Sequence, residues 1–388
     1  MRALALIDGE HYAPVVRDAL AALPYDVVGA LLVGGTEKLR GHEDYGVPLV
    51  DALDAVEADV VVDLSDEPVL GPRARFLWAS HALALGLPYE GADFRFEPPR
   101  YEPFPLPSLA VIGTGKRVGK TAVTGHVARL LARVRSVVVV SMGRGGPPEP
   151  EVRETPPSLD ELVALSRDGR HAASDYLETA ALARVPTIGC RRAGGGLAGA
   201  LVDSNVLEGA AIAAAREPDV VVFDGSGAAI PPVAVDTRLL VTRGRAFEEG
   251  LNPYRVLISD VVVLTGESDA DAIRAIKNVP VVRAELRLRP AEPLAGRRVA
   301  VFTTGPAPTQ HLDGDVVFVS RSLASRPRLR EELAQVDAEV YLVELKAAAI
   351  DVVAEAALAR GAQVVLADNE VVAPELDDML LGLVGVAA

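Results

Sequence analysis

A glycine-rich segment in the first third of the chain combines the residue types that bind phosphate. It follows an apolar run at 109–112 and precedes a helical pattern that continues to Arg133. This order of strand, flexible loop and helix lets backbone N–H groups and a helix N-terminus surround a phosphate group. The residues predicted to bind a nucleoside triphosphate are Gly113, Thr114, Gly115, Lys116, Arg117, Val118, Gly119, Lys120 and Thr121.

Two side chains of this phosphate-binding loop (P-loop) take their expected roles from the pattern G-x-x-x-x-G-K-[ST]. The Lys120 ammonium is expected to reach the β- and γ-phosphates of ATP, and the Thr121 hydroxyl is expected to bind Mg²⁺. One position departs from the pattern, since Thr114 stands where it requires glycine. A glycine-rich turn without a ligand is the alternative, but strand, loop and helix all agree with a P-loop.

Asp224 is predicted to be the carboxylate that completes such a site. It directly follows the apolar run at 220–223, and Gly227 gives an Asp-x-x-Gly sequence. We expect Asp224 to hold Mg²⁺, directly or through water, and the Gly227 N–H to contact the γ-phosphate. An ordinary acid between a strand and a turn is the alternative.

Several other loops carry charged side chains directly after apolar runs, where ligands bind in open α/β sheets. Guanidinium groups beside glycines suit a multiply charged anion, although solvated surface loops are the alternative. The predicted catalytic residues are Lys116, Lys120, Arg144 and Asp224. The predicted substrate ligands are Asp8, Glu10, His11, Arg144, Glu149, Arg191, Arg192, Arg243 and Arg245. The predicted metal ligands are Thr121, Glu149 and Asp224.

A helical stretch carries a further group of polar residues. Arg170, His171, Asp175 and Glu178 lie in it or beside it and could face the same cleft. A solvated helix face explains them equally well.

The elements that must position these residues are read from the apolar runs. Most runs are continuous rather than alternating, which indicates strands buried on both faces, and helical patterns separate them. This order predicts an α/β fold with mainly parallel sheets. The expected strands are 3–7, 27–33, 60–64, 109–112, 137–141, 220–223, 238–242, 261–264, 299–303, 316–320, 339–344 and 363–367.

Two proline-containing segments divide the chain into three expected domains. The segment 96–108 is too rich in proline for a helix or a central strand and reads as a connector. The segment 287–298 precedes a new strand. We therefore predict an N-terminal Rossmann-like α/β domain at 1–105, a P-loop NTPase domain at 106–290 and a small C-terminal α/β domain at 291–388.

Charge and composition exclude several classes of function. The 388 residues contain 39 Lys and Arg against 54 Asp and Glu, a net charge of −15. Such a chain lacks the basic field needed to bind nucleic acid or anionic membranes without specificity, but a local basic cleft can still bind a small anion. One cysteine, Cys190, excludes an intrachain disulfide and a cysteine-rich zinc site. Since no signal peptide or membrane span is recognisable, we expect a cytoplasmic protein.

The motifs together resemble those of a known family. The P-loop, with threonine at 114, is similar to the dethiobiotin-synthetase type. The wider set is similar to the cyclic 2,3-diphosphoglycerate synthetase family. That set comprises the DGEHY sequence from Asp8 to Tyr12, the loop Met142–Glu149, and Asp224–Gly227 before the paired prolines Pro231 and Pro232.

The resemblance implies an ATP- and Mg²⁺-dependent ligase. It would close 2,3-diphosphoglycerate, a small anionic phosphorylated substrate, into a cyclic pyrophosphate and release ADP and phosphate. A kinase or ligase acting on a related phosphorylated acid such as 2-phosphoglycerate, and a nucleotide-switched P-loop GTPase, are the alternatives. None of the five lysines is followed by x-Asp, which disfavours guanine recognition of the common type. The large apolar faces predict a homodimer.

Overall fold

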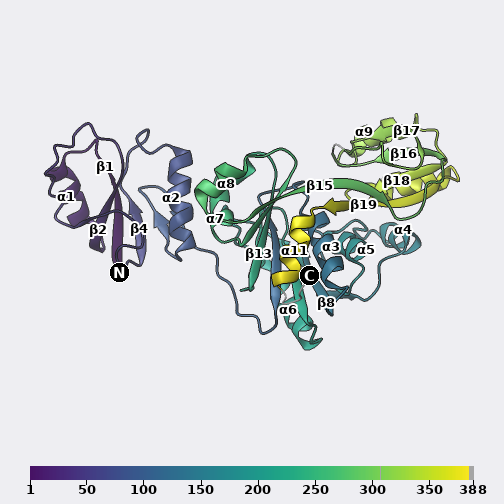
Figure 1. The fold of residues 1–388 in the computed structure, drawn as a ribbon, viewed down its shortest axis with the longest axis horizontal. Coiled ribbons are helices and arrows are strands. Elements are labelled where there is room, and N and C mark those ends of the chain that lie inside the picture. Colours follow the sequence, from purple (N-terminus) through teal and green to yellow (C-terminus); the bar gives the residue numbers. More distant parts are fainter. Residues whose placement is uncertain (306, 384–388) are drawn as a thin grey trace.

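The computed structural model describes residues 1–305 and 307–383, which form three α/β domains in a row (Figure 1). The N-terminal domain lies at the left of that view, the P-loop domain in the middle and the C-terminal domain at the upper right. The predicted α/β class with mainly parallel strands is confirmed. All twelve predicted strands are present, with ends shifted by two residues at most except in the last one, which continues to Val372 instead of ending at 367. None of the helices in the described part of the chain is long and apolar enough to cross a membrane.

The N-terminal domain is built on a six-stranded sheet in the order β3-β2-β1-β4-β5-β6, parallel except between β5 and β6. Leu4 and Leu6 of the central strand face helix α2, whereas Ala5 and Ile7 face helix α1, so the strand is buried on both sides. The elements are β1 (Arg2–Asp8), α1 (Ala13–Ala22), β2 (Asp26–Gly34), β3 (Leu49–Val50), β4 (Val60–Asp63), α2 (Pro72–Ala84), β5 (Tyr89–Glu90) and β6 (Arg95–Phe96).

The P-loop domain places β7 in the middle of a sheet with the order β11-β10-β8-β12-β7-β13-β14-β15. Its main strands run parallel, so their carboxyl ends share one edge of the sheet. The strands are β7 (Ser108–Gly113), β8 (Val137–Gly143), β9 (Glu151–Arg153), β10 (Thr187–Ala193), β11 (Asp203–Ser204), β12 (Val220–Asp224), β13 (Thr237–Thr242), β14 (Val261–Thr265) and β15 (Val281–Pro290).

Helices cover both faces of this sheet because its strands are apolar on both sides. Residues of α6 and α7 pack with Ile112 and Phe223 on one face, and α3 packs with Val111 and Val139 on the other. The helices are α3 (Lys120–Leu131), α4 (Leu159–Arg167), α5 (Asp175–Ala183), α6 (Val206–Ala215), the 3₁₀ turn η1 (Ala246–Glu248), α7 (Asn252–Leu257) and α8 (Ala270–Ile276).

The C-terminal domain continues the same sheet. The long strand β15 pairs with β14 in parallel and, further along, with β19 in antiparallel fashion, and the order then runs β19-β18-β16-β17. The predicted break at 287–298 therefore begins inside a strand rather than after one. The elements are β16 (Arg298–Phe302), β17 (Asp315–Ser320), α9 (Arg326–Leu333), β18 (Val340–Glu344), the π-helix η2 (Ala349–Ala354), α10 (Glu355–Ala359), β19 (Gln363–Val372) and α11 (Pro374–Leu383).

The proline-rich connector has no helix or named strand of its own, but it is attached to the P-loop domain. Glu102 forms a single bridge with Val233. The Tyr101 hydroxyl lies 2.9 Å from that of Tyr254, and Phe104 packs edge-on against Phe223 with ring centres 5.1 Å apart. These contacts restrain the segment between the first two domains.

Candidate functional site

The predicted P-loop has the strand, loop and helix that phosphate binding requires. Strand β7 ends at Gly113 and α3 begins at Lys120. Gly119 has φ 93°, and a Cβ there would lie 2.8 Å from the Leu286 Cδ1 atom, so the loop needs glycine at this position. Arg117, at φ 62°, also has a left-handed backbone.

The departure at Thr114 is explained by its surroundings. Its side chain is buried, and its hydroxyl lies 3.0 Å from that of Thr242 at the end of β13. Its backbone N–H donates to the Val241 carbonyl, and its carbonyl accepts from the Asn252 amide. Thr114 thus joins the loop to the neighbouring strand.

Asp224 lies beside the P-loop lysine, as its motif predicts. The Lys120 ammonium donates to Asp224 Oδ1 at 2.5 Å, and both side chains are buried. The Thr124 hydroxyl donates to the same oxygen at 2.8 Å, while the hydroxyls of Ser141 and Thr179 are 3.3 and 3.4 Å from Oδ2. Four donors therefore hold this carboxylate at the carboxyl end of β12.

The Asp-x-x-Gly loop is surrounded by basic side chains. Gly227 has φ 61°, and an ideal Cβ there would lie 3.4 Å from Arg144 Nη2, 3.6 Å from Arg192 Nη2 and 3.9 Å from Lys116 Cγ. These three residues, here called the cationic cluster, come from two loops and from the end of strand β10. Their convergence creates the local positive field that a multiply charged anion needs.

Arg192 is the buried member of this cluster. Its Nη2 donates to the Ser226 carbonyl at 2.8 Å, and its Nη1 donates to the Gly194 carbonyl at 3.2 Å. Burial, together with the nearby Arg144 charge, lowers the pKa of its guanidinium. The adjacent Arg191 is exposed and is not among the residues nearest to Gly227, so only one of the two predicted arginines belongs to the cluster.

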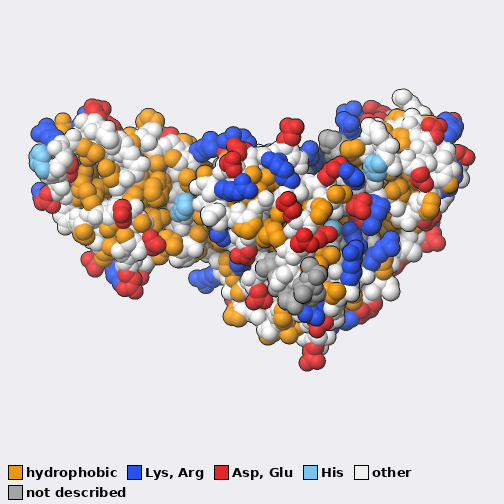
Figure 2. Space-filling model, in the orientation of Figure 1, with side chains coloured by type: hydrophobic (Ala, Val, Ile, Leu, Met, Phe, Trp, Pro, Cys, Tyr) orange, Lys and Arg blue, Asp and Glu red, His pale blue; other side chains and the backbone are white. Residues whose placement is uncertain are grey.

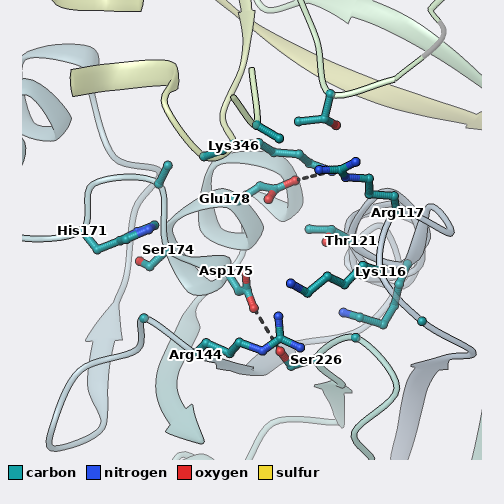
Figure 3. A pocket seen from close by; sticks show the side chains of 18 of the residues that line it. Lys116, Arg117, Thr121, Arg144, His171, Ser174, Asp175, Glu178, Ser226 and Lys346 are labelled. Carbon is teal, nitrogen blue, oxygen red and sulfur yellow. Dashed lines mark hydrogen bonds and ion pairs between the residues drawn. The ribbon is translucent and has the colours of Figure 1, made fainter. Parts of the chain in front are cut away.

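A cavity of about 330 Å³ lies over the P-loop (Figure 3). Five basic side chains and two carboxylates line it, a local charge opposite in sign to that of the whole chain. Its charged residues are Lys116, Arg117, Lys120, Arg144, Lys346, Asp175 and Glu178, and its other polar side chains are Thr121, His171, Ser174, Ser226 and Thr304.

Lys346 was not among the predicted site residues, and the helix residues Asp175 and Glu178 were only considered as possible neighbours. The Lys346 ammonium lies 3.2 Å from a Glu178 oxygen, and Glu178 is 6% exposed. Burial raises the pKa of Glu178 to about 7 even though the Lys346 charge opposes the shift. Lys346 follows the predicted strand 339–344. The criterion used for the other loops, a charged side chain after an apolar run, would therefore have identified it as well.

The predicted substrate ligands of the N-terminal domain lie outside this cavity. Asp8 is buried at the end of β1, where it accepts from the backbone of Glu10 and Asp66 and lies 2.7 Å from His11 Nδ1. Glu10 accepts from the backbone N–H of Thr36 at 3.1 Å. The structure thus joins these residues in a local network, and their binding of substrate stays a prediction.

Besides Arg192, four other predicted ligands are absent from the described lining of the cavity. Glu149 and Arg243 are exposed, as is Arg191, and Arg245 forms an ion pair with Glu248. Consequently, the structure brings Thr121 close to the P-loop cavity but does not bring Glu149 there. A binding role for these four residues stays a prediction.

Family models match nearly the whole chain. The models are described as the N-terminal, P-loop and C-terminal domains of cyclic 2,3-diphosphoglycerate synthetase, and they match residues 2–97, 108–284 and 290–370.

Relatives carrying the same name are similar over almost their full length. The protein of Rubrobacter xylanophilus is 49% identical, with 100% of this chain and 98% of the relative covered. Identity is 42% for Thermococcus kodakarensis, with 95% and 94% covered, and 37% for Methanothermus fervidus, with 99% and 97% covered.

Among solved structures, LpxK of Aquifex aeolicus in complex with ATP is similar over 73% of this chain and 90% of its own. The sequence identity is 14% and the TM-score is 0.44. A likeness at this level carries no argument about function.

Proposed function

Because the chain belongs to the cyclic 2,3-diphosphoglycerate synthetase family, we propose that it is an ATP-dependent ligase which closes 2,3-diphosphoglycerate into its cyclic pyrophosphate. The products are the cyclic compound, ADP and phosphate. The family supports this reaction over the alternatives of a kinase or ligase acting on a related phosphorylated acid and of a nucleotide-switched GTPase. The observation that carries the proposal is the basic cavity lined by the P-loop and by two members of the cationic cluster, Lys116 and Arg144.

The cyclisation needs activation because a phosphate oxygen is a poor leaving group. We propose that one substrate phosphate attacks the γ-phosphorus of ATP, breaking its bond to the β–γ bridging oxygen and releasing ADP. The activated phosphorus of the substrate is then attacked by an oxygen of its second phosphate, and inorganic phosphate leaves. Both phosphates belong to one molecule, so the second step benefits from a high effective concentration.

The protein's own task is to bring several anions together. We expect Lys120 and Lys116, which line the cavity, to bind the phosphates of ATP, and Arg144 extends from the facing loop (Figure 3). Preorganised cations stabilise the charge that develops during phosphoryl transfer. No general base is required, since the attacking phosphate oxygen is already anionic.

The donor set beside the P-loop fits Mg²⁺. The Thr121 hydroxyl lines the cavity, and the Asp224 carboxylate lies next to Lys120. No group of three or more His, Cys, Asp or Glu able to hold a metal occurs in residues 1–305 and 307–383, so phosphate oxygens would have to contribute ligands. When bound with ATP, Mg²⁺ would supply further charge neutralisation. The cytoplasmic location and the homodimer stay predictions.

Substrate-dependent release of ADP tests this function. The protein is incubated with ATP and Mg²⁺ and with 2,3-diphosphoglycerate, 2-phosphoglycerate or 3-phosphoglycerate. We expect only the diphosphorylated acid to stimulate ADP release strongly, because both phosphates take part in the reaction. Equal stimulation by a monophosphorylated acid would indicate a kinase instead.

A further inference from the structure

One basic residue of the cavity does not come from the P-loop domain. Lys346 follows β18 of the C-terminal domain, a strand of five buried residues. In Figure 3 its side chain extends across the cavity toward Glu178 of α5. The neighbouring residues Thr304, Ala324 and Ala347 line the same cavity. The carboxyl ends of β16 and β18, two strands of the C-terminal domain, therefore face the P-loop.

Lys346 is directed into this cavity by its local backbone. Its N–H donates to the Glu344 carbonyl at 2.8 Å, and its own carbonyl accepts from Ala349 at 2.9 Å. Ala347 has φ 45°, a conformation that costs free energy for a residue other than glycine. Strained backbone of this kind is concentrated at binding sites, and Arg117 on the opposite wall shows it as well.

The Glu178–Lys346 ion pair connects the P-loop domain to the C-terminal domain inside the cavity. Glu344, the other acid near Lys346, is already satisfied, since it accepts from the Thr304 N–H at 2.9 Å and the Asn369 amide at 2.7 Å. Glu178 is buried and has no role in the proposed reaction. A buried carboxylate needs a cation, and Lys346 provides it across the domain boundary.

The cavity also contains an unsatisfied hydrogen-bonding group. Ser174, just before α5, is 2% exposed, lines the cavity and has no hydrogen-bond partner for its hydroxyl among the described residues. Buried polar groups are almost always paired, so an unpaired one facing a cavity indicates a polar ligand.

We propose that Lys346 binds an anionic group of 2,3-diphosphoglycerate and that Glu178 is its counter-ion until the substrate displaces it. The inference rests on the proposed function. ATP occupies the P-loop side, where Lys116 and Lys120 lie, and the substrate is held between that side and the C-terminal domain. The C-terminal domain is thereby part of the substrate site.

Steady-state kinetics of Lys346→Ala, Lys346→Arg and Glu178→Gln test the proposal. We expect Lys346→Ala to raise the KM for 2,3-diphosphoglycerate at least about tenfold, the scale of a lost charged hydrogen bond, while the KM for ATP changes less than about twofold. Lys346→Arg should recover part of the loss because it restores the charge. Glu178→Gln should lower the KM for the substrate, since it removes the competing carboxylate.

Arg298→Ala is the matched control. It removes a cation of the same domain that pairs with Asp337 at 3.0 Å at the amino end of β16, away from the cavity. The proposal is overturned if Lys346→Ala weakens ATP and substrate equally, or if Glu178→Gln raises the substrate KM as much as Lys346→Ala does. Either result would indicate that the Glu178–Lys346 ion pair only holds the two domains together.

The wild-type protein separates this inference from the proposed function. If it forms no cyclic product, the proposed function fails. If it forms the product while Lys346→Ala has wild-type kinetic constants, only the role of Lys346 fails. Isothermal titration of 2,3-diphosphoglycerate into both proteins without ATP gives a second readout, with weaker binding expected for Lys346→Ala.

Discussion

At the scale of single residues, the site is organised by buried charges with several partners. Asp224 is completely buried and is held by Lys120 and by hydroxyls from α3, β8 and α5. Removing one partner of a buried ion pair leaves the other charge without compensation. Substitutions here will therefore affect stability as well as chemistry, and both must be measured.

Lys120→Ala should lower kcat for substrate-stimulated ADP release by about 10²–10³ or more, because the cation that meets the transferred phosphoryl group is lost. Circular dichroism checks that the fold is kept. Lys38→Ala provides a control, since Lys38 lies in the N-terminal domain and pairs with Glu37. ATP turnover retained by Lys120→Ala would refute the P-loop assignment.

The adjacent arginines allow a comparison within one strand. Arg192→Ala should raise the KM for 2,3-diphosphoglycerate about tenfold or more, because Arg192 belongs to the cationic cluster and is buried beside Ser226. Arg191→Ala should change it less than about threefold, because Arg191 is exposed. Equal effects on the substrate KM would show that the cluster is assigned wrongly.

At the scale of secondary structure, runs of buried aliphatic residues indicated the strands correctly. Strand β15 was missed because its charged residues alternate with apolar ones, as expected for a half-exposed strand. Strand β10 was missed because Thr187 and Gly189 interrupt its apolar residues and two arginines follow Cys190. The rule for continuous runs therefore identifies central parallel strands better than strands near the sheet edge or between domains.

Local sequence patterns likewise identified some residues of the site and missed others. The P-loop could be predicted because its chemistry lies in nine consecutive residues, and Asp224 because its motif follows a strand. The approach of Lys346 to Glu178 depends on how the C-terminal domain packs over α5, which no local pattern records. Arg191 and Arg192 could not be distinguished because their exposure depends on the register of β10.

The loop between β7 and α3 provides a test at this scale. Gly119→Ala should weaken ATP binding at least about tenfold, because the added Cβ meets Leu286 and Thr265 and the backbone has φ 93°. Fluorescence titration with an ATP analogue measures the change. Gly382→Ala in the exposed end of α11 is the control, since no atom lies within 4 Å of its added Cβ. Wild-type ATP affinity in Gly119→Ala would contradict the loop geometry.

At the scale of the whole molecule, the last described helix, α11, packs against the P-loop domain rather than against the C-terminal domain strands that precede it. Helix α11 packs against α3, the helix that begins with Lys120, and His126 Nε2 lies 2.6 Å from Asp377 Oδ1 (Figure 1). The surface view shows acidic and basic side chains interspersed, without one large basic face on the visible side (Figure 2). Five basic side chains, in contrast, converge on the cavity over the P-loop.

The Leu376→Ala variant tests how much the packing of α11 against α3 contributes to the stability of the protein. Leu376 is fully buried in the core shared with α3, so its truncation should lower the free energy of unfolding by about 2–5 kcal/mol. Urea unfolding measures the change. Leu358→Ala is the control, since Leu358 is 41% exposed and should cost far less. Similar losses for both variants would indicate that α11 contributes little to the core.

The central claim is that the protein joins the two phosphates of the bound substrate into a cyclic pyrophosphate. Phosphorus-31 NMR of the reaction tests this claim most directly. With ATP, Mg²⁺ and 2,3-diphosphoglycerate, we predict pyrophosphate resonances of a cyclic product that grow together with equal amounts of ADP and inorganic phosphate. Release of ADP without those resonances, or their absence while the folded protein binds both ligands, would contradict the account.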